Sequence, residues 1–298
     1  MSKPVVITDY QKEIIKTITT LSYRHSLWQV FTDFVEMAAL AISNSVDAIH
    51  KEKRETRYLE IIGKYNKDEQ QMFPKMMAYL VEALEHSLKF DGGPVDVLGQ
   101  IFHELELHNK WKGQFFTPTP VCEMMAMMTF GDGQEVKENG FVKVGEPACG
   151  SGAMVLGFAK AMKNKGFNYC NQMVVTATDV DLKCVHMAYL QFALYGIPAV
   201  VIHGNTLTLE EWSRWYTPVY LLDGWIWRSQ GSNTTARNAD DEALKMVDEP
   251  IYAAVRELIA GEIIAADEAE NVIEEDEIVI EQPIFEFREE KNGQLSLF

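Results

Sequence analysis

The stretch Glu146-Pro-Ala-Cys-Gly-Ser-Gly-Ala-Met154 decides the fold class of this chain. Apolar residues come just before it (Phe141, Val142 and Val144), as a short buried strand requires, and a run of small residues that can open a helix follows. Gly150 and Gly152 allow close approach of a ligand and dihedral angles that other residues resist. The order strand, glycine turn, helix is the layout by which an open α/β sheet receives a nucleotide-like ligand.

Three other segments extend this pattern. Residues Val174–Asp181 predict a strand that ends in acidic residues, and Ala199–Leu207 predict another that ends in Gly-Asn. Upstream, Gly113–Val121 (Gly-Gln-Phe-Phe-Thr-Pro-Thr-Pro-Val) leads into the helix-patterned stretch Cys122–Phe130. The set of four segments in one order is more specific than any one of them.

Each residue of these segments also has a simpler interpretation. Asp179 could cap a helix, Phe115 and Phe116 could be core residues, and Gly-Ser-Gly could form any turn. For isolated residues these interpretations are favoured. For the ordered set, a ligand-binding sheet edge is favoured.

The ordered set resembles the adenine-N6 DNA methyltransferases, most closely the modification subunits of type I restriction systems. The resemblance runs from about Asp96 to about Leu207. It implies an α/β, Rossmann-like fold of the S-adenosylmethionine (SAM)-dependent methyltransferases, complete or truncated, at residues 111–228. A helical N-terminal domain at residues 1–110 would precede it.

The resemblance also implies where SAM binds. Asp179 is placed to accept the ribose hydroxyls, and Glu146 would face the cationic methionine end. Asn205 would reach the adenine amine, and Phe116 with Thr117 would close over the cofactor and hold its carboxylate. The full set of cofactor-binding residues expected is Phe116, Thr117, Glu146, Pro147, Ala148, Gly150, Gly152, Asp179 and Asn205.

The catalytic tetrapeptide of that family, Asn/Asp-Pro-Pro-aromatic, does not occur in this sequence. Its oxygens would accept hydrogen bonds from the target amine, and its aromatic ring would stack on the flipped-out base. Thr217, Pro218 and Tyr220 keep one proline and one aromatic at about the right spacing, and are the catalytic candidates. They could be a degenerate remnant or part of an unrelated surface segment. A group of aromatic residues in this region could stack on bases, although a tryptophan-rich segment is more often part of a core or a protein interface. The group is Trp212, Trp215, Tyr216, Tyr220, Trp225 and Trp227.

The N-terminal third predicts packed helices. Leu27–Ala41 and Met72–Leu84 carry wide apolar stripes at helical spacing, whereas the charge-rich segment Lys51–Arg57 is expected to be a solvated connector. We find neither an apolar run long enough for a membrane span nor a secretory signal pattern. The four cysteines lack zinc-ligand spacing, so we expect no metal site, free thiols and a cytoplasmic protein.

The C-terminal segment, residues 229–298, is acidic. Residues 231–298 carry a net charge of −13 out of the total of −17. Ser229–Asn238 is a polar linker, Asp240–Ala265 has helical spacing, and Glu268–Glu290 is expected to be extended or disordered. Such a tail repels phosphate, and it could solubilise the protein or mimic the charge of DNA.

The last five residues, Gln294-Leu295-Ser296-Leu297-Phe298, resemble the pentapeptide with which bacterial polymerases and repair proteins dock on the β sliding clamp. The leucines and the phenylalanine can fill an apolar pocket, and the glutamine can supply an orienting hydrogen bond. The alternative is a terminal segment that packs on the protein itself.

Two functions from different classes follow. One is a SAM-binding, adenine-N6 methyltransferase-like protein that the β sliding clamp recruits to DNA, with the catalytic motif missing or degenerate. The other is a non-catalytic interaction protein on a methyltransferase scaffold, binding the clamp or a restriction–modification complex as an antirestriction or regulatory factor, such as a phage or plasmid encodes. The sequence leaves open whether methyl transfer occurs.

Overall fold

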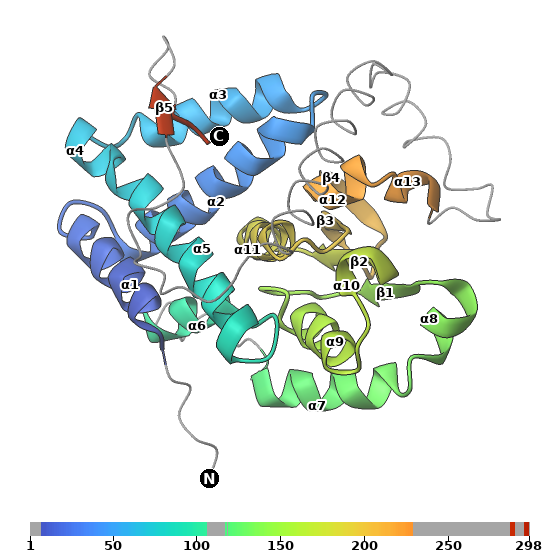
Figure 1. Cartoon of the computed structure of the whole chain (residues 1–298). Coiled ribbons are helices and arrows are strands. Elements are labelled where there is room, and N and C mark those ends of the chain that lie inside the picture. The colour runs from blue at the N-terminus through green and yellow to red at the C-terminus, as the bar shows by residue number, and fades with distance from the viewer. Residues whose placement is uncertain (1–6, 106–116, 118, 229–286, 290–294, 298) are drawn as a thin grey trace, which may run out of the picture. The chain divides into compact units, whose positions relative to one another are not determined.

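The computed structural model describes residues 7–105, 117, 119–228, 287–289 and 295–297. It divides into two compact units, residues 1–248 and 249–298, which we describe separately. Figure 1 traces the elements of the first unit from the N-terminal helices to the sheet.

A four-stranded sheet in the order β1-β2-β3-β4 forms the centre of the first unit. The strands β1 (Val142–Glu146), β2 (Met173–Asp179) and β3 (Ala199–Asn205) are parallel, and β4 (Glu210–Tyr216) runs antiparallel to β3. The carboxyl ends of the three parallel strands therefore meet at one edge of the sheet. Together with the surrounding helices, this sheet confirms the mixed α/β class expected from the sequence.

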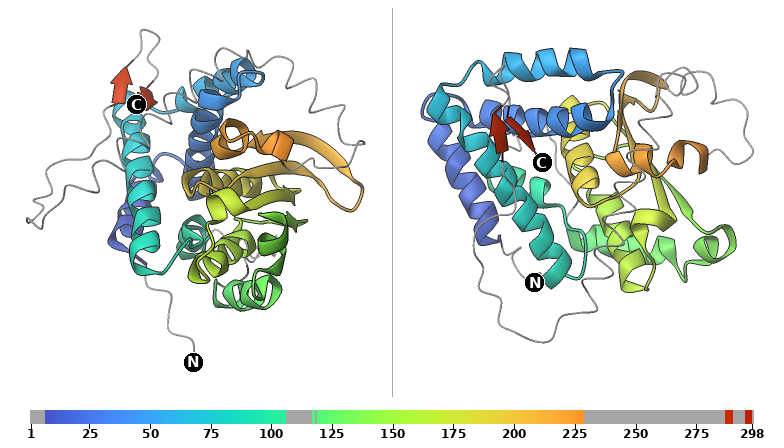
Figure 2. Two further views of the ribbon diagram at one scale, coloured as in Figure 1. Left: turned by 45° about the vertical axis from the view of Figure 1, so that its right-hand side comes forward. Right: turned by 45° about the horizontal axis from the view of Figure 1, so that its top comes forward.

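The two faces of the sheet are covered differently because successive side chains alternate between them. Val175 and Val201 pack into the main core with α9 (Ala153–Asn164) and α11 (Leu182–Leu194). Val174 and Val200 point the other way, into a small cluster with the short helices α12 (Pro218–Leu222) and α13 (Trp225–Arg228). The connections β1-α9-β2 and β2-α11-β3 thus place both crossover helices on one face, as two further views show (Figure 2).

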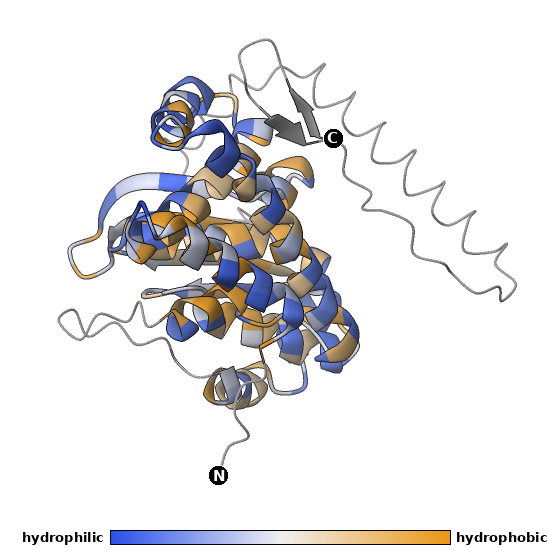
Figure 3. Ribbon diagram, turned by 90° about the vertical axis from the view of Figure 1, so that its left-hand side faces the viewer, coloured by the Kyte–Doolittle hydropathy of each residue, from blue (hydrophilic) through white to orange (hydrophobic). Residues whose placement is uncertain are grey.

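The N-terminal part is helical, as predicted. Its elements are α1 (Asp9–Leu21), α2 (Leu27–Val46), α3 (Lys51–Ile62), α4 (Lys67–Gln70), α5 (Met72–Phe90) and α6 (Val97–Glu104). The predicted apolar stripes fall on α2 and α5, and the hydropathy colouring of Figure 3 shows the helices striped in this way. One hydrophobic core extends from these helices into the sheet, and α11 contacts both α2 and the strands β2 and β3. The predicted domain boundary near residue 110 stays a prediction.

The interpretation of Lys51–Arg57 as a solvated connector was wrong, because these residues open α3. Arg54 is buried on this helix, and its guanidinium donates hydrogen bonds to Asp47 Oδ2 at 2.6 Å and to the Arg214 carbonyl at 2.8 Å. It also lies over the Trp215 ring, 4.1 Å from its centroid. A buried charge with these partners fixes α3 against α2 and β4.

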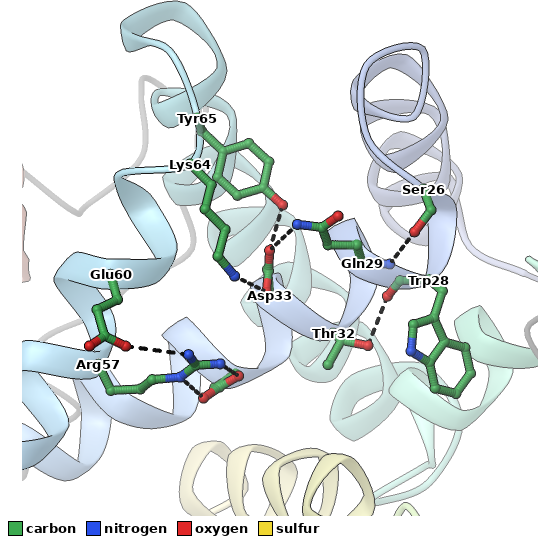
Figure 4. Close-up of polar contacts among 10 residues, drawn as sticks. Ser26, Trp28, Gln29, Thr32, Asp33, Arg57, Glu60, Lys64 and Tyr65 are labelled. Atoms are coloured by element: carbon green, nitrogen blue, oxygen red, sulfur yellow. Dashed lines mark hydrogen bonds and ion pairs between the residues drawn. The ribbon is translucent and has the colours of Figure 1, made fainter.

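Polar contacts also hold α2 to its neighbours (Figure 4). The buried Asp33 carboxylate accepts hydrogen bonds from Tyr65 Oη at 2.9 Å and Lys64 Nζ at 3.4 Å. Arg57 donates to both carboxylate oxygens of Glu36, at 2.7 and 3.0 Å. The helical region is therefore a fixed support for the sheet.

The remaining described elements are α7 (Thr119–Phe130), α8 (Gln134–Asn139) and α10 (Tyr169–Gln172) in the first unit, and β5 (Phe287–Glu289) and β6 (Leu295–Leu297) in the second. In the second unit β5 and β6 pair antiparallel over three residue pairs. Ser296 pairs with Arg288 in the register of this ribbon, while Gln294 and Phe298 of the predicted clamp-binding segment lie outside the described residues.

No described helix has the length and apolarity needed to cross a bilayer. Within the same residues we find no cluster of His, Cys, Asp and Glu that could hold a metal ion. All four cysteines are free thiols.

Candidate functional site

Three of the four predicted segments meet at the carboxyl edge of the parallel strands. The turn after β1 contains Glu146 to Gly152, Asp179 ends β2, and Asn205 ends β3. Cys149 N donates to the Thr178 carbonyl at 2.9 Å, and Thr206 Oγ1 donates to the Pro147 carbonyl at 2.6 Å. The turn after β1 is therefore bonded to the end of β2 and to the residue that follows β3.

Asp179 is the centre of this edge. Its Oδ2 accepts from Gly150 N at 2.8 Å, and its Oδ1 accepts from Asp181 N at 2.9 Å. A carboxylate has about four lone-pair sites, so each oxygen can still accept a second hydrogen bond. Asp179 does not cap α11, because Asp181 is the N-cap residue and accepts from Lys183 N. The side chain thus shapes the glycine turn and can receive two hydroxyl groups as well.

The glycine turn needs its glycines. Gly150 and Gly152 have φ of 54° and 96°, in the left-handed region that side chains disfavour. A Cβ on Gly152 would lie 2.6 Å from Phe192 Cε1 of α11, so this position also requires a residue without a side chain. The turn is accordingly packed against α11, and α9 begins at Ala153.

Glu146 and Asn205 stand on either side of Asp179, and both are half-buried. Glu146 Oε1 accepts from Ala148 N at 3.2 Å, and Asn205 Oδ1 accepts from Leu207 N at 3.0 Å. Beyond them the edge carries exposed apolar side chains at Val180 and Leu207, which are 58% and 95% exposed. An acid, an amide and an apolar rim around a glycine turn suit a ligand with a sugar, a charged group and a flat ring.

Of the other predicted cofactor-binding residues, some are exposed near this edge and one lies outside the described residues. Pro147 and Ala148 are exposed in the turn. Thr117 is exposed just before α7, and its carbonyl accepts from Cys122 Sγ at 3.6 Å. Phe116 lies outside the described residues, so the closure of this segment over a ligand stays a prediction.

A buried polar network under the turn was not recognised from the sequence. Ser151 Oγ donates to Asp96 Oδ2 at 2.5 Å, and Gln191 Nε2 donates to Asp96 Oδ1 at 2.9 Å and to the Ser151 carbonyl at 2.8 Å. Asp96 also caps α6 by accepting from Gly99 N at 2.8 Å. A Cβ on Gly99 would lie 2.0 Å from Asp96 Oδ2, so only glycine fits there. The network joins α6, the glycine turn and α11.

Burial keeps the nearby thiols protonated. Burial, followed by the charge of Asp179, raises the pKa of Cys149 well above its ordinary value, and the same causes raise the pKa of Cys184. Burial also raises the pKa of Cys122 to about 11. A neutral buried thiol is a poor nucleophile, so the buried Cys149 contributes packing to the turn.

The catalytic candidates lie at the opposite edge of the sheet. Because β4 is antiparallel, its end at Tyr216 pairs with Val200 near the start of β3. Thr217 is fully buried, where its Oγ1 donates to the Ile197 carbonyl at 2.8 Å and accepts from Ala199 N at 2.9 Å. Pro218 begins α12, and Tyr220 packs in the small cluster on the second face. The geometry therefore separates these three residues from the glycine turn, and we assign them no catalytic role.

Part of the chain is similar to known DNA methylases. Residues 95–223 match the N-6 DNA Methylase family. The chain is 25% identical over 139 residues to the type I restriction enzyme MpnII methylase subunit of Mycoplasma pneumoniae, covering 43% of this chain and 24% of that subunit. The chain thus spans about a quarter of this curated relative.

Two solved structures are similar over a larger part of the chain. One is a putative class I SAM-dependent methyltransferase from Listeria monocytogenes, with a TM-score of 0.40, 15% identity and coverage of 67% of this chain and 54% of that one. The other is the methyltransferase subunit of a type I restriction–modification system from Streptococcus thermophilus, with a TM-score of 0.38, 21% identity and coverage of 70% and 42%.

Proposed function

We propose that this protein binds SAM at the carboxyl edge of β1, β2 and β3, since residues 95–223 match the N-6 DNA Methylase family. The observation that carries the proposal is the Asp179 carboxylate. It ends β2 beside the glycine turn and keeps acceptor capacity on both oxygens. Acidic residues in this position accept ribose hydroxyls in nucleotide-binding α/β folds.

The other residues of the edge have complementary roles in this proposal. Glu146 would attract the ammonium of the methionine end, and Asn205 would accept from the adenine amine. The exposed Val180 would lie against the flat adenine ring. Phe116 and Thr117 would cover the methionine end. When bound, SAM supplies the methyl group and its sulfonium leaving group.

We further propose that the chain is the cofactor-binding part of an adenine-N6 DNA methyltransferase of the restriction–modification type, working in the cytoplasm. The similarity to a type I methylase subunit supports this assignment. Methyl transfer to adenine would need oxygen acceptors for the amine and a ring to stack on the base. Thr217, Pro218 and Tyr220 cannot supply them at the glycine turn, because they lie at the far edge of the sheet. Removing one hydrogen-bond partner of the oxyanion-hole type usually costs on the order of 10²–10³ in rate.

That same separation favours a second candidate function. The chain would then keep the methyltransferase scaffold and SAM while acting by interaction, as an antirestriction or regulatory factor. Transfer of tritiated methyl from SAM to unmethylated DNA distinguishes the two functions. Incorporation by the chain alone would support a complete enzyme, and none would support a component or a regulator.

Recruitment by the β sliding clamp is also part of the proposal. The β5–β6 ribbon that contains Leu295 and Leu297 has only three residue pairs. Ribbons this short are marginally stable, so the segment would leave the ribbon to bind the clamp. Removing Gln294–Phe298 is expected to abolish retention of the chain on immobilised clamp. Retention of the shortened chain would exclude this docking.

Calorimetry with SAM tests the central part of the proposal. The wild-type chain is expected to bind one SAM, and Asp179→Ala to weaken binding at least about tenfold, since hydrogen bonds to a charged group contribute roughly 1.5–3 kcal/mol. Asp179→Asn keeps the side-chain size and one oxygen acceptor but loses the charge and the second acceptor. It can therefore still support the glycine turn while it binds the ribose hydroxyls less well, which distinguishes the two roles of Asp179. Asp223→Ala, at the exposed end of α12, is the matched control. Unchanged affinity in both Asp179 variants, with folding intact, would remove Asp179 from the site.

A further inference from the structure

The outer edge of β1 is open within the described residues. β1 pairs with β2 on one side only. The opposite end of the sheet is protected, because Arg54 of α3 donates to the Arg214 carbonyl of β4 and lies over Trp215. An unprotected edge strand presents backbone donors and acceptors that another strand can use.

A groove runs along this open edge. A cavity of about 480 Å³ is lined by all of β1, by the end of α7 with the turn after it, and by α9. Phe130, Val155 and Phe158 contribute its apolar walls. The cavity thus follows the whole length of β1, whose one described neighbour in the sheet is β2.

Helix α7 continues the apolar surface outward from the groove. Only Cys122, Ala126 and Phe130 of this helix are buried. The opposite side carries large exposed apolar residues, which are 40 to 77% exposed: Val121, Met124, Met125, Met127 and Met128. A helix with apolar side chains on all sides normally has a covering partner, and methionines are frequent at surfaces that bind other polypeptides.

The topology indicates what the edge lacks. The connections from β1 to β2 and from β2 to β3 both lead away from the open edge. In open α/β sheets the ligand crevice lies where the strand order reverses, between the first strand and a neighbour on its other side. A strand added parallel to β1 would end beside Glu146, at the same edge as Asp179. The residues after that strand would then face the proposed SAM site.

We propose that a separate polypeptide docks here by adding a parallel, apolar β-strand to β1. The same polypeptide covers the methionine side of α7. The residues that follow its strand supply the amide and aromatic groups that bind the target adenine. The charges of the groove specify this occupant. Asp132, Glu135 and Glu146 line it with one basic residue, Lys143, so the incoming strand has basic flanks. A second copy of the chain would bring the same acidic groove and a net charge of −17. The inference rests on the proposed SAM site, whose crevice the partner would complete.

The test uses the full chain and a synthetic peptide as the probe. The peptide has two lysines, an apolar strand of alternating valine and isoleucine, and then Asn-Pro-Pro-Tyr. A matched peptide has proline at two strand positions and cannot pair. Fluorescence anisotropy measures binding, and hydrogen exchange with mass spectrometry measures protection of residues 142–146. SAM binding is measured in the same samples by calorimetry.

The proposal would be supported if the first peptide binds saturably and protects residues 142–146 while the proline-containing peptide does neither. The variant Asp132→Lys/Glu135→Lys reverses two exposed charges of the groove lining and should then weaken binding about tenfold or more. The matched reversal Glu82→Lys/Glu85→Lys, at exposed positions of α5 away from the groove, should not. These sites are exposed, so both variants should have the same melting temperature as the wild type.

Three results would overturn the proposal. One is absence of protection at 142–146 while SAM still binds, which would leave the proposed function intact. The second is protection without peptide in a dimer, which would make a second copy the occupant. The third is protection without peptide in a monomer, which would assign the groove to the chain's own segments. Peptide binding without SAM binding would instead support the docking surface and contradict the proposed function.

Discussion

Replacing Ser151 by alanine tests the network beneath the glycine turn. The Ser151 hydroxyl is buried and donates to Asp96 Oδ2 at 2.5 Å. A hydrogen bond to a charged acceptor contributes roughly 1.5–3 kcal/mol, and alanine leaves only a small void. Asp96 keeps its bonds from Gly99 N and Gln191 Nε2, so it is not left unpaired. We therefore expect the free energy of unfolding to fall by about 2 kcal/mol.

Thermal unfolding followed by circular dichroism measures this change. In a domain of 150–250 residues, about 1 kcal/mol lowers Tm by about 2–4 °C, so Ser151→Ala should lower it by about 4–8 °C. Ser45→Ala is the matched control, because Ser45 is exposed and its hydroxyl donates only to the Ile42 carbonyl of its own helix. That control should stay within about 0.5 kcal/mol of wild type. Equal melting of the two variants would refute the assigned role of the network.

Two other changes probe the packing around the sheet. Gly152→Ala should destabilise the fold by about 2–4 kcal/mol in urea unfolding, since its Cβ would lie 2.6 Å from Phe192 Cε1 at a φ of 96°. The control Gly166→Ala, at a φ of 81° with no atom within 4 Å of the new Cβ, should cost only about 1 kcal/mol. Equal losses in the two variants would show that the contact with Phe192 is not the cause. Burial lowers the pKa of His186 from 6.5 to about 3, so only the unfolded chain binds its proton between these values. His186 should therefore lower the free energy of unfolding by up to about 1.4 kcal/mol for each pH unit below about 6.5. The variant His186→Phe keeps a ring against Trp215 and should make this dependence on pH less steep. An unchanged slope would show that His186 is not the cause.

The sequence predicted the sheet edge well because short-range signals determine it. Apolar runs followed by glycine or acid located β1, β2 and β3 within about two residues of their observed ends. Asp179 and Asn205 could be placed together because the carboxyl ends of parallel strands meet at one edge. The strand β4 was missed because Glu210–Tyr216 buries only Trp215, and an edge strand with one half-covered face has no clear periodicity.

Two features depended on contacts that sequence reasoning does not reach. Ser151, Gln191 and Asp96 are 40 to 95 residues apart in the chain, and only the fold brings them together. Arg54 appeared solvated within its charged segment, yet Asp47 and Trp215 bury it. A buried charge is recognisable only from its partners. The helix predicted at 240–265 lies outside the described residues.

A crystal structure of the chain with S-adenosylhomocysteine would show whether the carboxyl edge of β1, β2 and β3 holds the cofactor. We expect the ribose hydroxyls within hydrogen-bond distance of the Asp179 carboxylate, with the methionine end beside Glu146 and the glycine turn unchanged. Electron density for the ligand at any other place on the chain, or a filled crevice at saturating ligand, would contradict it.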